Sequence, residues 1–181
     1  EALAVIQEAC VAMNSPLTQV GEDLRYTIRH ADRKRQVFDV ESQTETYHDL
    51  DIPLMGSYQV TNAATAIGVV EILKRGSLPI FSEAIAGGLQ ATRIPGRFQM
   101  VQENPCIILD GAHNVLSVQT LAQTLQTLFP ERRIIIILSF IHSGKCSQQT
   151  VPRRHLRSRN LHWILLHSKH HHSIWYCLLF F

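Results

Sequence analysis

The segment Asp110-Gly-Ala-His-Asn combines a carboxylate, a glycine, an imidazole and an amide directly after an apolar stretch. A carboxylate can accept hydrogen bonds from ribose hydroxyls or support a metal, glycine lets a ligand approach the backbone, and histidine adds a titratable ring. Open α/β sheets bind ligands at the carboxyl ends of their strands, which is where this segment is expected. The spacing alone fits equally well a simpler role, in which Asp110 and Asn114 only cap the next helix.

Two further segments have residue types suited to binding an anion or a nucleotide. Arg97 follows Gly96, and a guanidinium offers a fork of donors that matches paired phosphate oxygens. Asn62 lies in a glycine-led, alanine-rich segment, residues 56–64, whose first helical turn could present backbone N–H groups to an anion. Taken alone, each segment also fits a structural role, as a surface arginine and as an ordinary buried helix.

Together and in this order, three segments resemble the folylpolyglutamate synthase/dihydrofolate synthase branch of the Mur ligase superfamily. They are Gly56-Ser-Tyr-Gln-Val-Thr-Asn-Ala-Ala-Thr-Ala, Pro95-Gly-Arg-Phe-Gln and Leu109-Asp-Gly-Ala-His-Asn, and the resemblance covers residues 1–138. Gln59, where the cell-wall Mur ligases usually have histidine, and the Asp110-Gly-Ala-His run favour the folate branch over peptidoglycan ligases.

The resemblance implies an ATP-dependent enzyme that adds L-glutamate to the γ-carboxylate of a folate through an acyl phosphate, with Mg²⁺ beside the phosphates. By position, Asn62, Arg97 and Asp110 match the family's ATP-contacting residues: Asn62 near the adenine or ribose, Arg97 at the phosphates, Asp110 at the ribose hydroxyls. His113 matches a histidine at the cleft for the incoming glutamate. The four cysteines are scattered with no CxxC pair, and the longest apolar runs, residues 134–138 and 178–181, are too short to span a bilayer. We therefore expect a cytoplasmic protein that binds neither membrane nor nucleic acid.

The phosphate-binding loop of the family, G-x-x-x-x-G-K-[ST], does not occur in the 181 residues. The only Gly-Lys pair, Gly144-Lys145, is followed by Cys146. We therefore expect the P-loop and most Mg²⁺ ligands to belong to a missing N-terminal half, and the isolated chain to be inactive. The alternatives are an inactive remnant, a subunit of a split enzyme, and a Mur-type peptidoglycan amino-acid ligase.

Hydrophobic periodicity predicts an α/β protein in two incomplete parts. Residues 1–93 are expected to be the end of a P-loop ATPase-type central domain, and residues 94–138 the start of a Rossmann-like C-terminal domain. Helices are predicted over 2–13, 56–74, 82–90 and 115–129. Strands are predicted over 17–20, 24–29, 36–40, 44–50, 98–102, 106–109 and 133–138. The last two strands and the helix between them form a predicted βαβ unit with parallel strands.

Residues 139–181 differ in composition from the rest of the chain. All 15 acidic residues lie within 1–140, whereas 141–181 hold six of the 17 Lys/Arg and seven of the ten histidines. This change favours an aberrant, frameshifted and disordered tail. Its Cys and His residues (Cys146, His155, His162, His167 and 170–172) also allow a metal site, and its arginines a nucleic-acid contact, although the spacings match no zinc pattern.

Overall fold

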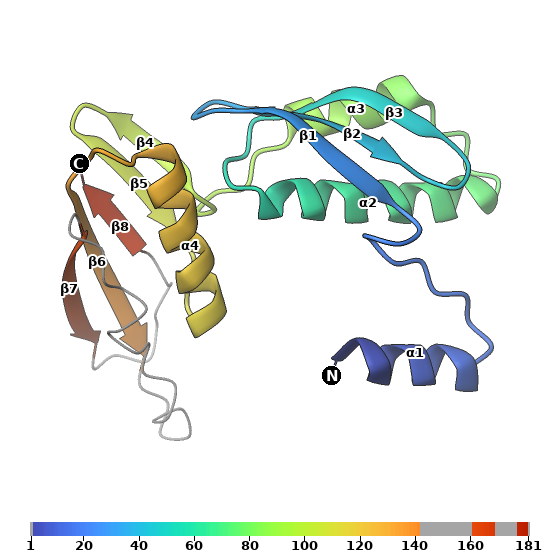
Figure 1. The fold of residues 1–181 in the computed structure, drawn as a ribbon, viewed down its shortest axis with the longest axis horizontal. Coiled ribbons are helices and arrows are strands. Elements are labelled where there is room, and N and C mark those ends of the chain that lie inside the picture. The colour runs from blue at the N-terminus through green and yellow to red at the C-terminus, as the bar shows by residue number, and fades with distance from the viewer. Residues whose placement is uncertain (1, 142–160, 169–176, 181) are drawn as a thin grey trace. The chain divides into compact units, whose positions relative to one another are not determined.

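The computed structural model describes residues 2–141, 161–168 and 177–180 of the chain (Figure 1). These residues divide into two compact units. The first comprises Glu1–His30, Gln36–Ile52 and Val60–Ala91, and the second Ala31–Arg35, Pro53–Gln59 and Thr92–Phe181. Both units combine helices with strands, which confirms the predicted α/β class.

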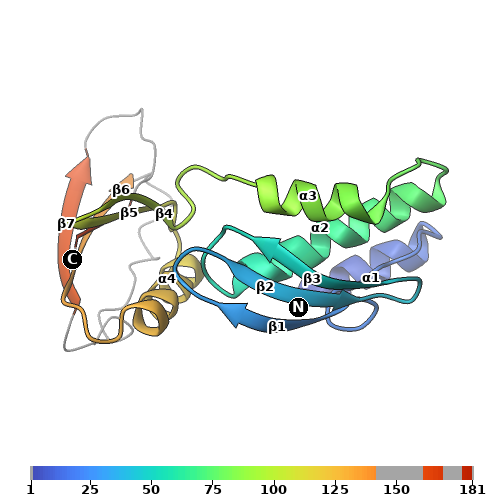
Figure 2. The ribbon, with the colours of Figure 1, turned by 90° about the horizontal axis from the view of Figure 1, so that it is seen from above.

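The first unit is built around a three-stranded sheet of order β1-β2-β3, with β1 at Arg25–Ala31, β2 at Gln36–Glu41 and β3 at Thr46–Ile52. Strands β2 and β3 are antiparallel, and their inward positions, Phe38, Val40, Leu50 and Ile52, are buried. Figures 1 and 2 show α2 (Tyr58–Arg75) running along one face of this sheet, and α3 (Ser82–Ala91) contacts β3. Alternation of period two therefore places the apolar side chains of the sheet in one core with the helices.

Helix α2 buries Val60, Ala63, Ala64 and Ile67, the face that helical spacing predicts. The same spacing also predicts Leu73 on this face, and that prediction is wrong, because Leu73 is 43% exposed and the buried position in the last two turns is Glu71. The hydroxyl groups of Ser42 and Tyr47 both donate to Glu71 Oε1, which explains how a carboxylate is accommodated there.

Gly76, which follows the predicted helix 56–74, predicts that a glycine ends α2, but the structure differs. Ser77, not Gly76, takes the left-handed conformation (φ 73°), and Leu78 N–H donates to Leu73 O while Ser77 N–H donates to Lys74 O. These two bonds are those of a Schellman motif, in which the residue after the helix reverses the backbone. Helix α1 (Ala2–Ala12) lies where predicted and buries no residue. The predicted strand over 17–20 is wrong, since only an isolated bridge joins Val20 to Leu24.

The second unit contains a five-stranded sheet of order β4-β5-β8-β6-β7. Its elements are β4 (Gln99–Glu103), β5 (Cys106–Asp110), α4 (Val115–Leu128), β6 (Ile134–Ile141), β7 (Leu161–Ser168) and β8 (Cys177–Phe180). Strand β8 pairs antiparallel with both β5 and β6, so β5 and β6 run in the same direction, as the βαβ prediction requires. They are not neighbours, however, because β8 lies between them.

The core of the second unit forms between the sheet and α4. Phe98, Ile108, Ala112, Ile134 and Ile136 pack with a stripe of α4 and with Met55, which comes from the loop before α2. The α4 stripe consists of Val118, Leu121, Leu125 and the following Phe129, a spacing of three and four residues that places them on one face. This core fixes the carboxyl end of β5 against the start of β4.

The predicted domain limits at 93 and 138 stay predictions. The second unit begins its long segment at Thr92, and β6 runs to Ile141. The disorder predicted for 139–181 also stays a prediction: within that range the structure describes the end of β6 together with β7 and β8. Cys146, His155 and residues 170–172 of the alternative metal site lie outside the described residues.

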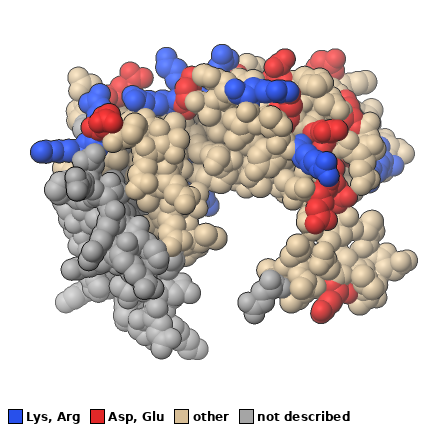
Figure 3. Space-filling view, viewed as in Figure 1, with Lys and Arg blue, Asp and Glu red and all other residues tan. Residues whose placement is uncertain are grey.

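Charged side chains of both signs lie interspersed on the face shown in Figure 3. In the first unit Arg29 forms an ion pair with Asp39 at 2.6 Å, and Lys74 forms one with Glu45 at 2.6 Å. Within the described ranges, none of the helices is long and apolar enough to cross a membrane.

Candidate functional site

The carboxyl end of β5 and the start of α4 place the Asp110–Asn114 segment at one edge of the second unit. Asn114 caps α4: its side chain accepts from Ser117 N–H at 2.9 Å, and the Ser117 hydroxyl accepts from Asn114 N–H, forming a capping box. Asp110 takes no part in that cap. The interpretation in which both Asp110 and Asn114 only cap the helix therefore holds for Asn114 alone.

Asp110 holds two backbone segments with its two carboxylate oxygens. Oδ2 accepts from Phe98 N–H and Oδ1 from Ala112 N–H, both at 2.8 Å, and the residue is 5% exposed. Burial raises the pKa of Asp110 above its ordinary 3.8, while the two backbone bonds and Arg97 act in the opposite direction. Each oxygen retains a lone pair beyond its backbone bond, so the carboxylate can still accept from a ligand hydroxyl.

Arg97 is the exposed middle residue of a turn, and hydrogen bonds hold the residue on each side of it, Gly96 and Phe98. Gly96 has φ 69° and donates its N–H to Gln99 Oε1 at 2.9 Å. Phe98 has φ 47°, is 1% exposed and is tied to Asp110. Phe98 is thus a non-glycine residue in the left-handed region, a conformation that costs about 1–2 kcal/mol and is offset here by core burial and a charge-assisted bond.

The turn brings the Arg97 guanidinium against Gly111. A side-chain carbon at Gly111 would lie 3.8 Å from Arg97 Nη1 and 3.4 Å from the Gly96 carbonyl oxygen. These are ordinary contact distances, so the guanidinium packs directly beside the Gly111 backbone. Arg97 and Asp110, separated by 12 intervening positions in sequence, are brought together by the β4–β5 pairing, in which Gln99 opposes Leu109.

His113 is exposed, and its ring Nδ1 lies 2.9 Å from the Gly111 carbonyl oxygen. A carbonyl oxygen only accepts, so this bond requires the proton on Nδ1. In the neutral ring the lone pair is then on Nε2. The fold thereby selects one tautomer of the histidine that the sequence associates with glutamate.

Tyr58 is a neighbour of this edge to which the sequence assigned no role. Gly56 has φ 95°, and a side-chain carbon there would come within 2.4 Å of Tyr58 Cε1, so the ring occupies the space over the glycine. Burial, and then the negative charge of Asp110, raise the pKa of Tyr58 to about 12, with Arg97 opposing. The motif Gly56-Ser-Tyr could have indicated this contact, because a glycine two residues before an aromatic residue at a helix start leaves room for the ring to pack on the backbone.

Asn62, the remaining predicted ATP contact, lies in α2 of the first unit and is exposed. Arg97, Asp110 and His113 all lie in the second unit. The structure thus brings three of the four predicted site residues together within one unit.

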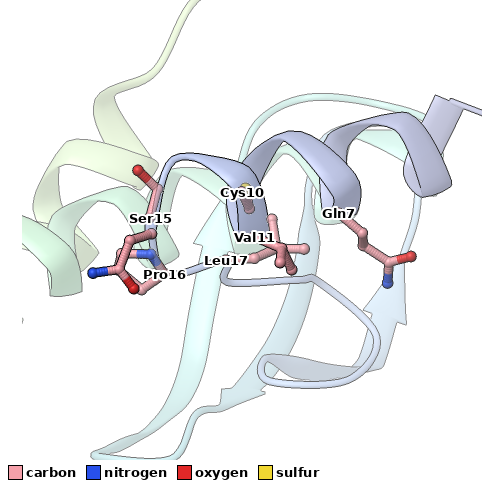
Figure 4. Close-up of a pocket in the computed structure, with 7 residues that line it drawn as sticks. Gln7, Cys10, Val11, Ser15, Pro16 and Leu17 are labelled. Atoms are coloured by element: carbon pink, nitrogen blue, oxygen red, sulfur yellow. The ribbon is translucent and has the colours of Figure 1, made fainter.

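A separate hollow of about 530 Å³ lies along α1, and none of the predicted site residues lines it (Figure 4). Its walls come from the end of α1 and the segment after it, chiefly Val11, Pro16 and Leu17. In the described part of the chain, no group of three or more His, Cys, Asp or Glu side chains is placed to hold a metal ion.

Comparison with known proteins agrees with the resemblance carried by the motifs. The family described as "Mur ligase, glutamate ligase domain" matches residues 96–162, the range that contains Arg97, Asp110 and His113. The dihydrofolate synthase/folylpolyglutamate synthase of Bacillus subtilis (strain 168) is 30% identical over 159 residues, which are 87% of this chain and 34% of that protein. The chain is a relative of the folylpolyglutamate synthases.

Solved structures of folylpolyglutamate synthases have the same fold. The enzyme from Lactobacillus casei matches with a TM-score of 0.64 and 29% identity, over 77% of this chain and 35% of that one. A structure described as an FPGS–AMPPCP–folate complex matches with a TM-score of 0.67 and 29% identity, over 77% of this chain and 33% of that one. The chain therefore spans about a third of the length of the folylpolyglutamate synthases that it matches.

Proposed function

We propose that this chain forms part of an ATP-dependent ligase that joins L-glutamate to the γ-carboxylate of a folate. The observation that carries the proposal is the pairing of the Arg97 turn with the buried Asp110 carboxylate, inside the range that matches the glutamate ligase domain. Several relatives bear the name folylpolyglutamate synthase, and one matching structure is described as a complex with AMPPCP and folate.

In this proposal Arg97 and Asp110 bind opposite ends of a nucleotide. The Arg97 guanidinium is exposed and offers donors to phosphate oxygens, while Asp110 retains one accepting lone pair on each oxygen for ribose hydroxyls. Asn62, on α2, offers an amide to the adenine or the ribose. Gly111 lies directly beside both groups, since a side-chain carbon there would be in ordinary contact with the guanidinium and with the Gly96 carbonyl oxygen.

The reaction consists of two group transfers. The γ-phosphoryl group of ATP passes to the folate γ-carboxylate, giving an acyl phosphate and ADP. The glutamate amine then attacks the acyl carbon, the C–N bond forms as the C–O bond to phosphate breaks, and the amine loses a proton. His113, with its proton on Nδ1, presents Nε2 as an acceptor suited to the ammonium or amine of glutamate.

The 181 residues include no P-loop motif. We propose that catalysis requires a P-loop segment in addition to the residues described, and that the 181-residue chain by itself is inactive. Mg²⁺ remains part of the proposed reaction, but the described residues include no cluster fitted to hold it. The P-loop segment is therefore the proposed source of the metal ligands, and the proposed location of the protein is the cytoplasm.

The test measures AMPPCP binding and glutamate ligation by the 181-residue chain, alone and mixed with the P-loop segment of a folylpolyglutamate synthase. Ligation is detected as a mass increase of one glutamate residue on folate with release of ADP. We expect ligation only in the mixture, and we expect Arg97→Ala to weaken AMPPCP binding at least tenfold, the size of a charge-assisted contact. Arg93→Ala removes an equal charge from a nearby exposed position and is the matched control.

Absence of AMPPCP binding and of ligation in the mixture, with a folded sample, would overturn the proposal and leave an inactive remnant. Equal losses in Arg97→Ala and Arg93→Ala would refute the role of Arg97 and indicate non-specific electrostatics. Ligation onto a UDP-linked muramyl peptide instead of a folate would favour the Mur-type peptidoglycan alternative.

A further inference from the structure

The bond between Gly96 and Gln99 has a consequence for the nucleotide site. Arg97 is exposed, and a free arginine side chain on a flexible turn would lose much conformational entropy on binding a phosphate. Here the backbone on both sides of Arg97 is held in left-handed geometry, at Gly96 by Gln99 and at Phe98 by Asp110. The Arg97 N–H also donates to the Ile94 carbonyl oxygen at 3.3 Å. The direction of the Arg97 Cα–Cβ bond is therefore set before any ligand arrives, which narrows the region that the guanidinium can reach.

The two anchors differ in strength and in what else they do. Phe98 is held by its burial in the core and by a carboxylate that is itself 5% exposed, so its position belongs to the packing of the unit. Gly96 has no side chain to pack, and its N–H is held by the side-chain oxygen of the exposed Gln99. Gln99 is thus the anchor that can be removed without opening the core.

We propose that Gln99 is a positioning residue for Arg97, which it orients toward the phosphates of a nucleotide by fixing the Gly96 N–H. This inference rests on the proposed function for the class of ligand, a nucleoside polyphosphate. Gln99 acts through Arg97 and makes no contact with the reacting atoms. Gln99 also begins β4 opposite Leu109, which connects the Arg97 turn to the strand that carries Asp110.

The test compares Gln99→Met, which has similar length but no accepting oxygen, with Gln102→Met on the same strand. Gln102 donates to the Asn104 carbonyl group and lies away from the Arg97 turn in sequence, so it controls for loss of a β4 glutamine. We expect Gln99→Met to weaken AMPPCP binding about fivefold, the size of one neutral hydrogen bond, and to leave adenosine binding unchanged. A purely structural role would weaken both ligands together.

A second comparison asks whether Gln99 acts through Arg97. In an Arg97→Ala background, Gln99→Met should cause no further loss of AMPPCP affinity, because the side chain that it orients is gone. A full fivefold loss in that background, or unchanged AMPPCP affinity in Gln99→Met alone, would overturn the inference.

A ligand-free measurement separates this inference from the proposed function. We expect NMR of Gln99→Met to show faster exchange of the Gly96 amide and a shifted, narrowed Arg97 Nε signal, with both restored in Gln99→Glu, which retains an accepting oxygen. If the wild-type mixture binds no AMPPCP, the proposed nucleotide function fails while these spectra still decide whether Gln99 orders Arg97. An Arg97 signal identical in wild type and Gln99→Met would refute the positioning role.

Discussion

Asp110→Asn should loosen the turn that carries Arg97, because asparagine can replace only one of the two carboxylate oxygens. Oδ1 and Oδ2 of Asp110 each accept one backbone N–H at 2.8 Å, from Ala112 and Phe98. In asparagine one of these positions becomes an NH₂ group, which faces an N–H donor and cannot accept. A hydrogen bond to a charged group contributes about 1.5–3 kcal/mol to stability, so we expect Asp110→Asn to destabilise the local structure by that amount.

Hydrogen exchange of the Phe98 and Ala112 amides measures this loss locally, which matters because a chain with two units need not unfold in one step. A loss of about 1.5–3 kcal/mol accelerates exchange roughly 10- to 150-fold for at least one of the two amides. Asp32→Asn is a matched control. Asp32 also accepts two backbone N–H groups, from Lys34 and Arg35, but through the single oxygen Oδ1, which asparagine retains.

The pH dependence provides a second readout for the same substitution. Burial is the largest cause of the raised pKa of Asp110, so the folded state holds its proton to a higher pH than the unfolded chain does. This group alone therefore increases stability as pH falls from its folded pKa toward 3.8, and Asp110→Asn should abolish that contribution. Equal exchange in wild type and Asp110→Asn, or an equal change in Asp32→Asn, would refute the reasoning.

Three other predictions concern the backbone and the first unit. Ser77→Gly should raise the stability of α2 by about 1 kcal/mol in thermal unfolding, because Ser77 has φ 73°; a lower melting temperature would contradict this. Gly56→Ala should destabilise by about 1–3 kcal/mol, since φ is 95° and the new carbon would lie 2.4 Å from Tyr58 Cε1; far-ultraviolet circular dichroism during denaturant titration checks it. The hydrogen bond from Lys74 is the first cause that lowers the pKa of Glu45 below 4.5. The ionised Glu45 side chain therefore stabilises the fold above pH 4.5, and this stabilisation is lost as the pH falls through the lower folded pKa. Glu45→Gln should reduce the loss of stability in acid, as measured by unfolding at a series of pH values.

The positions of most helices and strands could be predicted from the sequence, because their apolar residues recur at the spacing of a helix or a strand. Helix α2 and strands β2 and β3 lie within a few residues of their predicted limits, and the first turns of α2 bury the apolar face that helical spacing predicts. The incorrect prediction of buried residues in α2 occurs where a polar side chain occupies a buried position. Glu71 takes a core position that periodicity assigns to a hydrophobic residue, since two hydroxyl donors satisfy its carboxylate from strand β3 and the turn before it.

The helix ends and the sheet order were less predictable because they depend on single backbone conformations and on long-range pairing. Ser77 adopts a left-handed conformation that glycine usually provides, so the neighbouring Gly76 was a misleading signal. The insertion of β8 between β5 and β6 depends on residues 177–180, which are distant in sequence from both partners. Local pattern predicts that β5 and β6 run in the same direction, but it does not predict which strand separates them.

The residues of the candidate site could be predicted from the sequence, but the hydrogen bonds that join them could not. Arg97 and Asp110 were identified from separate segments, whereas the link between them passes through Phe98, whose left-handed N–H bonds to Asp110. That link changes what Asp110 does: its carboxylate orders the guanidinium turn through the backbone before it accepts any ligand hydroxyl. In the proposed nucleotide site the same carboxylate contacts a ribose hydroxyl, so we expect displacement of Asp110 to alter both ends of a bound nucleotide and displacement of Gln99 to alter only the phosphate end. The two substitutions therefore separate recognition of the nucleoside from orientation of the phosphates.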